Sequence, residues 1–368
     1  MKVLLLSTGS RIGGEETFTR NLALALTQKG VDVIVCPGGE VQKEDLQKNG
    51  IKICDVDITG RKPWGLYKGA KGIAHYSKEN NIDIIHAQAV GPAIMGVLAK
   101  RFCSCRTPWL WTNHGITDFA YSHIVKRLNS LDRIISNSDY VYVMLKSHGV
   151  SELKLKRIHN GINIESFTVS DSEKSQNRIK AEKEFNIPSN NKIITYVGRL
   201  SPEKGVNVLL ESFIGVHGTI PNSTCLLIGD GPERGKYEDF VRNSNCKDSF
   251  VFAGFRKDIK ELLSASDVLV LPSLIETFSL TTLQAFVART AVIASDVGGT
   301  PEQVLPDFNG LLFKSLDVDD LKNKIIYMLN HPEKAEIYKS HARELCENYL
   351  NDDRMTNEII TTYTDLLK

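Results

Sequence analysis

The chain repeats one pattern, in which short apolar runs alternate with longer segments of helical periodicity. The opening run, residues 2–8, ends in small residues. Glycines follow at positions 9, 13 and 14, and then a helical pattern over residues 18–26. This order predicts a strand, a glycine-rich loop and a helix. Similar apolar runs recur at 31–36, 82–86, 108–112 and 133–136. The rhythm predicts a doubly wound parallel α/β sheet in the first half.

The same rhythm restarts after a polar stretch at residues 170–177. We therefore expect a domain junction between residues 160 and 191. Later strands are predicted at 192–197, 224–228, 250–253, 268–272 and 291–295, and helices at 206–214, 258–265, 280–289 and 318–329. The pattern predicts two Rossmann-like domains, residues 1–168 and 169–350. Parallel sheets bind ligands at the carboxyl ends of their strands, so two facing domains would share a cleft.

Composition supports an ordinary globular chain of about two domains. Its 368 residues are 42% hydrophobic and 24% charged, which excludes wholesale disorder. The longest uncharged stretch, residues 84–99, is too short and too polar for a membrane span, which needs about 20 apolar residues. No signal peptide is evident, so we expect a cytoplasmic protein. Its seven cysteines are odd in number and scattered, which indicates reduced thiols.

Charge is distributed unevenly although the net charge is only +1. Residues 1–169 carry a net charge of +7, and residues 170–368 carry −6. A positive half favours phosphate-bearing partners or the inner face of an anionic membrane. A solvated face that binds nothing is the alternative.

Several loops carry candidate chemistry. Gly13 and Gly14 precede a helix and could bring backbone N–H groups to a phosphate, although a tight turn is the alternative. The sequence lacks both the dinucleotide fingerprint and the P-loop, so neither NAD binding nor ATP hydrolysis is supported. Gly198, Arg199 and Lys204 follow the strand at 192–197. Two cations at that edge could neutralise a leaving diphosphate without a metal; a surface salt bridge is the alternative.

Further polar positions follow later strands. Glu276 lies between a strand and a helix, where it could bind a polyhydroxylated ligand or merely start the helix. Residues 300–303, with Thr, Pro and Gln, have the pattern of a capped helix start. His114 ends a strand of the first half, and such a histidine taken alone is usually structural.

Together these segments resemble the retaining nucleotide-sugar glycosyltransferases of family 4, which have the GT-B fold: two Rossmann-like domains that face each other across a cleft. The resemblance covers nearly the whole chain. It is carried by residues 13–14, 112–115, 160–167, 198–205, 229–232, 276–284 and 296–302.

The resemblance implies roles for these residues. Arg199 and Lys204 would bind the donor diphosphate, Glu276 the sugar hydroxyls, and His114 the sugar near the reaction centre. Other donor contacts would come from Gly13, Gly14, Gly198, Asp230, Gly231, Arg256, Thr277, Phe278, Ser279, Leu280 and Gln284. Asn160 and Gly161 would lie between the domains, and Glu15 and Arg11 are candidates for the acceptor side. A C-terminal helix over about residues 351–368 would cross back to the first domain.

One position departs from the family pattern. Gln284 stands where relatives have a second acid that binds the nucleotide ribose. Replacing a charge-assisted hydrogen bond by a neutral one would weaken donor binding about tenfold. Thr277 and Ser279 also occupy positions where glycines are common in the family.

The expected activity is transfer of a sugar, from a UDP-sugar by preference, to a hydroxyl of a saccharide or lipid-linked acceptor in bacterial glycan synthesis. No cofactor or nucleic acid is expected. No metal is expected either, because the acidic pair Asp317 and Asp319, which has the spacing of a metal signature, lies at a helix start. Contact with the inner face of the membrane is a hypothesis. Alternatives are a GT-B epimerase, a sugar-nucleotide-binding partner subunit with weak catalysis and, less favoured, a hydride-transfer enzyme.

Overall fold

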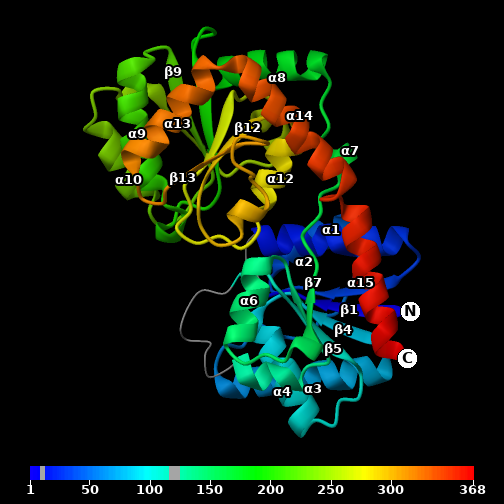
Figure 1. Cartoon of the computed structure of the whole chain (residues 1–368). Helices are drawn as coiled ribbons and strands as arrows, with labels where there is room; N and C mark the ends of the chain where they lie inside the picture. The colour runs from blue at the N-terminus through cyan, green and yellow to red at the C-terminus, as the bar shows by residue number, and fades with distance from the viewer. Residues whose placement is uncertain (9–12, 116–124) are drawn as a thin grey trace. The chain divides into compact units, whose positions relative to one another are not determined.

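The computed structural model describes residues 1–8, 13–115 and 125–368 (Figure 1). The chain forms two compact units, and each is described by itself. The first comprises Met1–Asn160 and Asp352–Lys368, and the second comprises Gly161–Asn351. No helix in these ranges is long and apolar enough to cross a membrane.

A parallel sheet of seven strands forms the centre of the first unit, in the order β3-β2-β1-β4-β5-β6-β7. The strands are β1 (Lys2–Leu6), β2 (Asp32–Cys36), β3 (Lys52–Ile53), β4 (Ile84–Ala87), β5 (Trp109–Asn113), β6 (Arg133–Ser136) and β7 (Leu155–Arg157). Five of them were predicted. The pattern missed β3 and β7 because two or three residues are too few to show a period.

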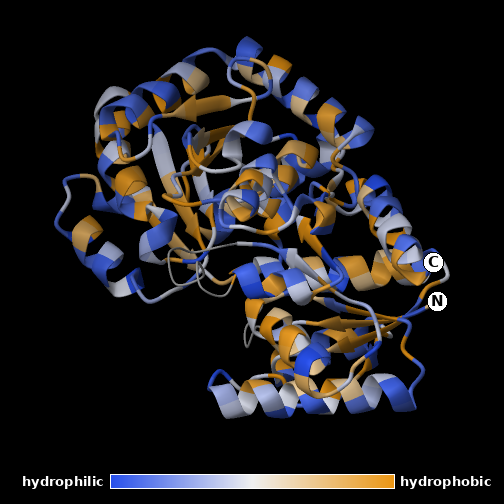
Figure 2. Cartoon of the chain, turned by 60° about the horizontal axis from the view of Figure 1, so that its bottom comes forward, coloured by the Kyte–Doolittle hydropathy of each residue, from blue (hydrophilic) through white to orange (hydrophobic). Residues whose placement is uncertain are grey.

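Helices cover the first sheet and bury one face each. They are α1 (Gly14–Gln28), α2 (Glu40–Lys48), α3 (Pro63–Glu79), α4 (Val90–Phe102), α6 (Asp139–Ser147) and α15 (Asp352–Leu367), with short 3₁₀ turns at Lys126–Ser130 and Glu152–Lys154. The central strands are apolar along their length and the helices are mixed, as Figure 2 shows by hydropathy. Burial of both sheet faces accounts for those continuous apolar runs.

The C-terminal helix α15 belongs to this first unit, where it packs beside α1 (Figure 1). The Tyr363 hydroxyl lies 2.6 Å from Nδ1 of His86 on β4, and both side chains are fully buried. Nε2 of the same imidazole lies 2.6 Å from the Thr112 hydroxyl on β5. These hydrogen bonds attach the end of the chain to the middle of the sheet.

The second unit has a parallel sheet of six strands in the order β10-β9-β8-β11-β12-β13. Its strands are β8 (Lys192–Val197), β9 (Ser223–Ile228), β10 (Phe250–Gly254), β11 (Val268–Leu271), β12 (Ala291–Ser295) and β13 (Leu311–Phe313). Its helices are α7 (Ile164–Phe167), α8 (Asp171–Glu184), α9 (Val206–Thr219), α10 (Arg234–Arg242), α11 (Ile259–Ser264), α12 (Leu280–Val287), α13 (Val318–Asn330) and α14 (Pro332–Asn348), with 3₁₀ turns at Pro202–Lys204, Lys247–Ser249 and Thr300–Glu302.

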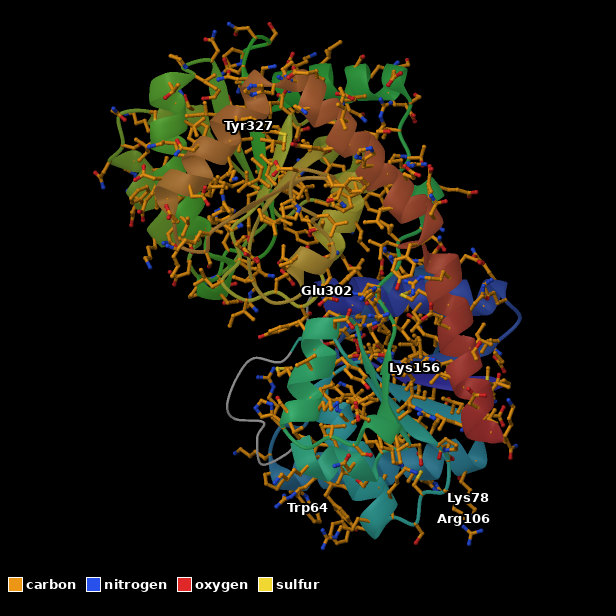
Figure 3. The ribbon with its side chains drawn as sticks, in the orientation of Figure 1. Trp64, Lys78, Arg106, Lys156, Glu302 and Tyr327 are labelled. Carbon is orange, nitrogen blue, oxygen red and sulfur yellow. The ribbon has the colours of Figure 1, made fainter. Side chains whose placement is uncertain are left out.

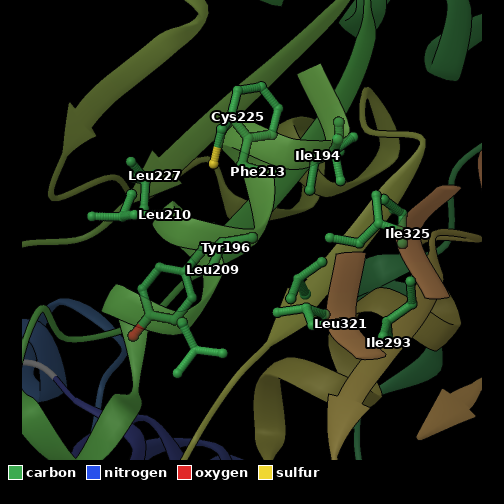
Figure 4. Close-up of a cluster of buried hydrophobic side chains, with 14 of the residues drawn as sticks. Ile194, Tyr196, Leu209, Leu210, Phe213, Cys225, Leu227, Ile293, Leu321 and Ile325 are labelled. Carbon is green, nitrogen blue, oxygen red and sulfur yellow. The ribbon is translucent and has the colours of Figure 1, made fainter. Parts of the chain in front are cut away.

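The core of the second unit joins β8 and β9 to α9 and α13. Figure 4 shows Phe213 of α9 packed over Cys225 of β9, with Leu321 and Ile325 of α13 on the same cluster. Large apolar side chains from four elements thus exclude water beneath the strand ends, and this fixes the loops that follow those strands.

The polar stretch at 170–177 is helical. It begins helix α8, where Ser170 and Glu173 form a capping box. Arg178 on that helix donates to Asp267 at 2.9 Å, and Asn177 donates to Ser264 at 2.9 Å. The apolar pattern did not predict this helix, because only Ala181 on it is buried.

Candidate active site

Three loops of the second unit meet at the carboxyl ends of β8, β9 and β11. Gly205 ends the first of them with φ of 61°, a left-handed conformation that favours glycine. A Cβ atom there would lie 2.1 Å from the Pro272 carbonyl oxygen, so the backbones of the β8 and β11 loops touch. Leu274 N also donates to the Glu203 carbonyl at 2.9 Å. These contacts fix the spacing of the two loops.

The loop after β9 packs equally closely against the β8 loop. A Cβ on Gly229, whose φ is 136°, would lie 1.9 Å from the Gly198 oxygen, and one on Gly231 would lie 2.2 Å from the Leu200 oxygen. No other residue fits either position without moving the backbone. The glycines singled out in the sequence therefore permit close approach of the two loops.

Lys204 and Glu276 lie together at this edge. The Lys204 ammonium is 2.8 Å from Oε2 of Glu276, and the two side chains are 29% and 18% exposed. Ser273 Oγ donates to the same oxygen at 3.4 Å, while Thr277 N donates to Oε1 at 3.3 Å. The sequence predicted that both residues belong to one site, and the structure brings them into contact.

Arg199 projects into solvent from the same β8 loop. Its guanidinium makes no ion pair with any residue in the described part of the chain. Its carbonyl accepts a hydrogen bond from the Tyr196 hydroxyl at 2.8 Å, which holds the backbone of the loop. The guanidinium thus has all five donors available for an anion.

A buried glutamine holds the start of α12. Gln303 is fully buried, and its side chain accepts from Ser279 N at 2.7 Å and donates to Ser279 O at 2.9 Å. Ser279 Oγ caps the helix by accepting from Thr282 N at 3.2 Å. Residues 300–303 were interpreted as a capped helix start; they form a 3₁₀ turn, and Gln303 instead bridges to α12. Sequence spacing could not reveal a partner 24 residues away.

The remaining predicted residues of this region differ in availability. The Phe278 side chain is buried in the core, and Thr277 is buried, so Leu280 and Gln284 are the more accessible members of the set. The Gln284 amide is partly buried and has no side-chain hydrogen bond to a described residue. It is free to meet a ligand.

Arg256, expected near the donor base, is occupied by carboxylates. Its guanidinium forms two hydrogen bonds to Asp258, at 2.8 and 2.6 Å, and one to Glu184 at 2.6 Å. These bonds raise the pKa of Arg256 and hold the pKa of the Asp258 carboxyl below its usual range. Its side chain therefore fastens the loop after β10 to α8.

Asp230 is exposed and shapes its own turn. Its Oδ1 accepts from Gly231 N at 2.7 Å, and its Oδ2 lies 3.6 Å from Arg234. The carboxylate thus orders the β9 loop at the edge where Gly198 and Leu200 meet it.

In the first unit, His114 follows β5 directly. Its Nε2 lies 2.9 Å from Oε1 of Gln88, and its ring packs 4.3 Å from that of Phe18. Burial lowers the pKa of His114 to about 3, so the imidazole is neutral at physiological pH. The neighbouring amide nitrogens of Gln88 and Asn113 are buried without a partner in the described residues, which is costly. No motif in the sequence points to Gln88.

The start of α1 carries the two acids next to the glycine pair. Glu16 accepts from Gly13 N at 2.9 Å, at the start of its own helix. Glu15 accepts from Ser7 Oγ at 3.1 Å and Thr8 N at 3.3 Å. Burial, followed by the charge of Glu16, raises the pKa of Glu15 to about 7. Gln42 donates to Ser7 at 2.9 Å, which extends this network beyond what the sequence predicted.

Other expected positions can be placed briefly. Gly14 is exposed at the first turn of α1, where no side chain caps the helix. Arg11 lies outside the described residues. Asn160 and Gly161 are buried at the end of the first unit and the start of the second.

The Asp317 and Asp319 pair has structural partners. Asp317 caps α13 by accepting from Asp320 N at 3.0 Å, and Asp319 pairs with Lys322 at 2.6 Å. This arrangement agrees with the prediction that these acids begin a helix.

Two family models match consecutive parts of the chain. Residues 12–166 match Glycosyltransferase Family 4, and residues 177–345 match Glycosyl transferases group 1. The chain is a family 4 glycosyltransferase. Its two parallel α/β units have the GT-B fold, as the sequence predicted.

Relatives of this glycosyltransferase act on diverse acceptors. It is 27% identical to N-acetyl-alpha-D-glucosaminyl L-malate synthase of Bacillus anthracis, over 97% of this chain and 95% of that one. It is 26% identical to UDP-Gal:alpha-D-GlcNAc-diphosphoundecaprenol alpha-1,3-galactosyltransferase of Escherichia coli, over 79% and 77%. Among solved structures, Anabaena HepE in complex with UDP and glucose matches with a TM-score of 0.88 at 22% identity, covering 99% of this chain and 100% of that one.

Proposed function

We propose that this glycosyltransferase moves a sugar from a UDP-sugar to a hydroxyl of a saccharide or lipid-linked acceptor, with retention of anomeric configuration. The observation that carries the proposal is the contact of Lys204 with Glu276. Exposed Arg199, on the same β8 loop, has no ion pair within the described residues. One anionic and two cationic groups at one sheet edge suit a ligand with a diphosphate and a hydroxylated ring. Residues 169–350 would bind the donor, and residues 1–168, with the C-terminal helix, the acceptor.

The chemistry follows from charge. Cleavage of the donor bond leaves negative charge on the diphosphate, which Arg199 and Lys204 would stabilise together with N–H groups at the start of α1, including that of Gly14. Protein cations would then do the work that a divalent ion does in other transferases. Glu276 would accept hydrogen bonds from sugar hydroxyls and orient the ring.

Neutral His114 fits a positioning role near the sugar. With its pKa lowered to about 3, the imidazole can accept or donate one hydrogen bond without adding a charge next to a developing oxocarbenium ion. A protonated histidine there would oppose that positive charge. No residue is assigned as a covalent nucleophile, and attack of the acceptor from the face of the departing diphosphate would give retention.

UDP is favoured by two observations on similar proteins. The Anabaena structure holds UDP and glucose, and the Escherichia coli relative is named for UDP-Gal. Acceptors named for the two relatives, L-malate and a diphosphoundecaprenol-linked sugar, both carry negative charge. A positive first half would suit such an acceptor.

The stereochemical part is tested by NMR of the product formed from an α-linked UDP-sugar, in buffer with EDTA. An α-linked product formed at an unchanged rate is expected. A β-linked product would overturn retention, and abolition by EDTA that magnesium reverses would overturn metal independence. Donor binding without turnover would favour the partner-subunit alternative, for which Gln284 is the motivating observation.

A further inference from the structure

One face of the first unit concentrates unpaired positive charge. Arg61 and Lys62 precede α3, and Lys68, Lys71 and Lys78 lie along it; all five are exposed. None of them has an ion-pair partner within residues 1–8, 13–115 and 125–368. Five such cations within 18 residues concentrate positive charge along this segment.

The spacing places these side chains on a single stripe. Lys68, Lys71 and Lys78 are separated by three and seven residues, which puts them on the outer side of α3 with exposed His75 between them. Exposed Glu79 pairs with His75 at 3.1 Å and is the acid on that side. Thr59 Oγ1 and Thr59 N donate to the Asp57 carboxylate at 2.6 and 2.9 Å, and these bonds are the main cause of the lowered pKa of Asp57.

The positive end of the α3 dipole adds to this charge. The first turn contains no acid, and Lys62 is the N-cap, followed by Pro63. Cations at a helix N-terminus oppose the macrodipole, so folding alone does not favour them there. An anionic partner would relieve that cost.

Neighbouring α4 continues the face. Arg101 and Arg106 are exposed and unpaired in the described residues. Thr107 Oγ1 donates to Ser77 at 3.4 Å, which places Arg106 beside Lys78, as Figure 3 shows. We call Arg61, Lys62, Lys68, Lys71, Lys78, Arg101 and Arg106 the basic face.

Two large aromatic side chains lie on the basic face. Trp64 is 70% exposed with its ring 5.8 Å from Tyr67, and Phe102 is 58% exposed with Arg101 over its ring at 5.3 Å. Gly60 and Gly65 pack backbone to backbone, since a Cβ on Gly60 would lie 2.7 Å from the Gly65 Cα. The turn that presents Trp64 is therefore compact and held in place.

We propose that the basic face docks this glycosyltransferase on an anionic phospholipid membrane. Lysines and arginines would neutralise lipid phosphates, while Trp64 and Phe102 would enter the interfacial region, where amphipathic aromatic side chains are favoured. Exposed aromatic side chains among the cations favour a bilayer over double-stranded DNA, which is bound mainly through its phosphates. Docking through this face would hold the first unit, which carries the proposed acceptor side, at the surface that bears lipid-linked acceptors. The inference rests on the proposed function for this last step alone.

The test is co-sedimentation of the full chain with sucrose-loaded vesicles in about 0.1 M salt, where screening is moderate. Vesicles of phosphatidylcholine alone are compared with vesicles that also contain phosphatidylglycerol. We expect binding to the anionic vesicles only. The triple variant with Lys68→Glu, Lys71→Glu and Lys78→Glu should bind the anionic vesicles at least about a hundredfold more weakly, because each cation lost weakens binding about fivefold.

The matched control is the triple variant with Lys48→Glu, Lys126→Glu and Lys156→Glu. These exposed lysines belong to the first unit but lie outside the basic face. The control should bind the vesicles at most about fivefold more weakly, because charges more than a Debye length from the membrane are screened. Trp64→Ala should lower binding without changing its salt dependence, whereas the triple reversal should flatten that dependence. UDP-induced thermal stabilisation, measured on every variant, separates this proposal from the donor-site assignment and reports folding.

Absence of binding to anionic vesicles, or equal losses in the test and control triples, would overturn the proposal. Tighter retention on double-stranded DNA than on vesicles, through the same lysines, would overturn it in favour of a nucleic-acid partner. Failure of UDP to bind while vesicle binding persists would reject the donor assignment and leave membrane docking standing.

Discussion

The ammonium nitrogen of Lys204 lies 2.8 Å from Oε2 of Glu276, although 72 residues separate them in sequence. The loops after β8 and β11 that carry them are held together by the Gly205 contact with Pro272. Neither group is deeply buried, so a ligand can reach both. The proposed donor site depends on this pair.

Lys204→Ala should reduce kcat at least a hundredfold, or roughly 2.7 kcal/mol of transition-state stabilisation, because it removes a charge matched to the leaving diphosphate. Steady-state kinetics with a saturating donor would measure this. The control is Lys236→Ala, which removes a surface lysine paired with Glu233 on the same unit. Near-normal turnover in Lys204→Ala would refute the role of Lys204.

Gln284→Glu should strengthen donor binding up to about tenfold, since a carboxylate forms charge-assisted hydrogen bonds with ribose hydroxyls. The Gln284 side chain has no hydrogen bond to a described residue, so the change breaks none of those. Calorimetry of UDP binding would report it, with Gln284→Met as a control of similar size that should bind more weakly. Weaker binding by the Glu variant would show that Gln284 does not face the ribose.

Glu15→Gln should alter the pH dependence of stability. Folding raises the pKa of Glu15 to about 7, so the folded chain binds this proton more tightly than the unfolded chain does. The wild type therefore loses stability as the pH rises from about 4.5 to above 7, whereas glutamine stays neutral. At pH 8 the variant should be more stable by about 1–3 kcal/mol, and near pH 4 the two should agree.

Urea unfolding at each pH would measure that difference. Tryptophan fluorescence is suited to it, because Trp64, Trp109 and Trp111 all lie in the first unit. Glu44→Gln, at an exposed position on α2, is the control and should show little change. A stability difference for Glu15→Gln that does not depend on pH would contradict the assigned environment of the carboxyl.

Tyr363→Phe should destabilise the first unit by about 1–3 kcal/mol, because it leaves Nδ1 of fully buried His86 without its partner. The loss would show as a lower urea midpoint by tryptophan fluorescence. Tyr142→Phe removes a partly buried hydroxyl that has no hydrogen bond to a described residue and serves as the control. Equal midpoints for the two variants would mean that α15 is not held by this bond.

The sequence predicted both sheets because parallel strands buried on two faces leave continuous apolar runs. Residues 192–197 and 291–295 match β8 and β12 to the residue. Edge strands β3 and β7 escaped because they are short, and polar α8 escaped because its contacts are hydrogen bonds from Asn177 and Arg178 rather than an apolar stripe. Periodicity reports burial, so elements that bury little are not detected.

Among site residues, order along the strands predicted that Lys204 and Glu276 share one edge, because parallel strands end on the same side. Their contact distance could not be predicted, since it depends on the packing of Gly205 against Pro272. Gln303 and Gln88 were missed as supports because a long-range hydrogen bond leaves no periodic trace. Arg256 is predicted to contact the donor, and its three hydrogen bonds to carboxylates could not be predicted from the sequence.

The most direct test of the donor site is a panel of UDP-, GDP-, ADP- and dTDP-sugars, measured by thermal stabilisation of the purified chain and by slow release of free nucleotide. We expect one UDP-sugar to give the largest thermal stabilisation and the fastest nucleotide release, and we expect Lys204→Ala to abolish that release. If no nucleotide sugar binds at millimolar concentration, Lys204, Glu276 and Arg199 do not form a working donor site, and the central claim is wrong.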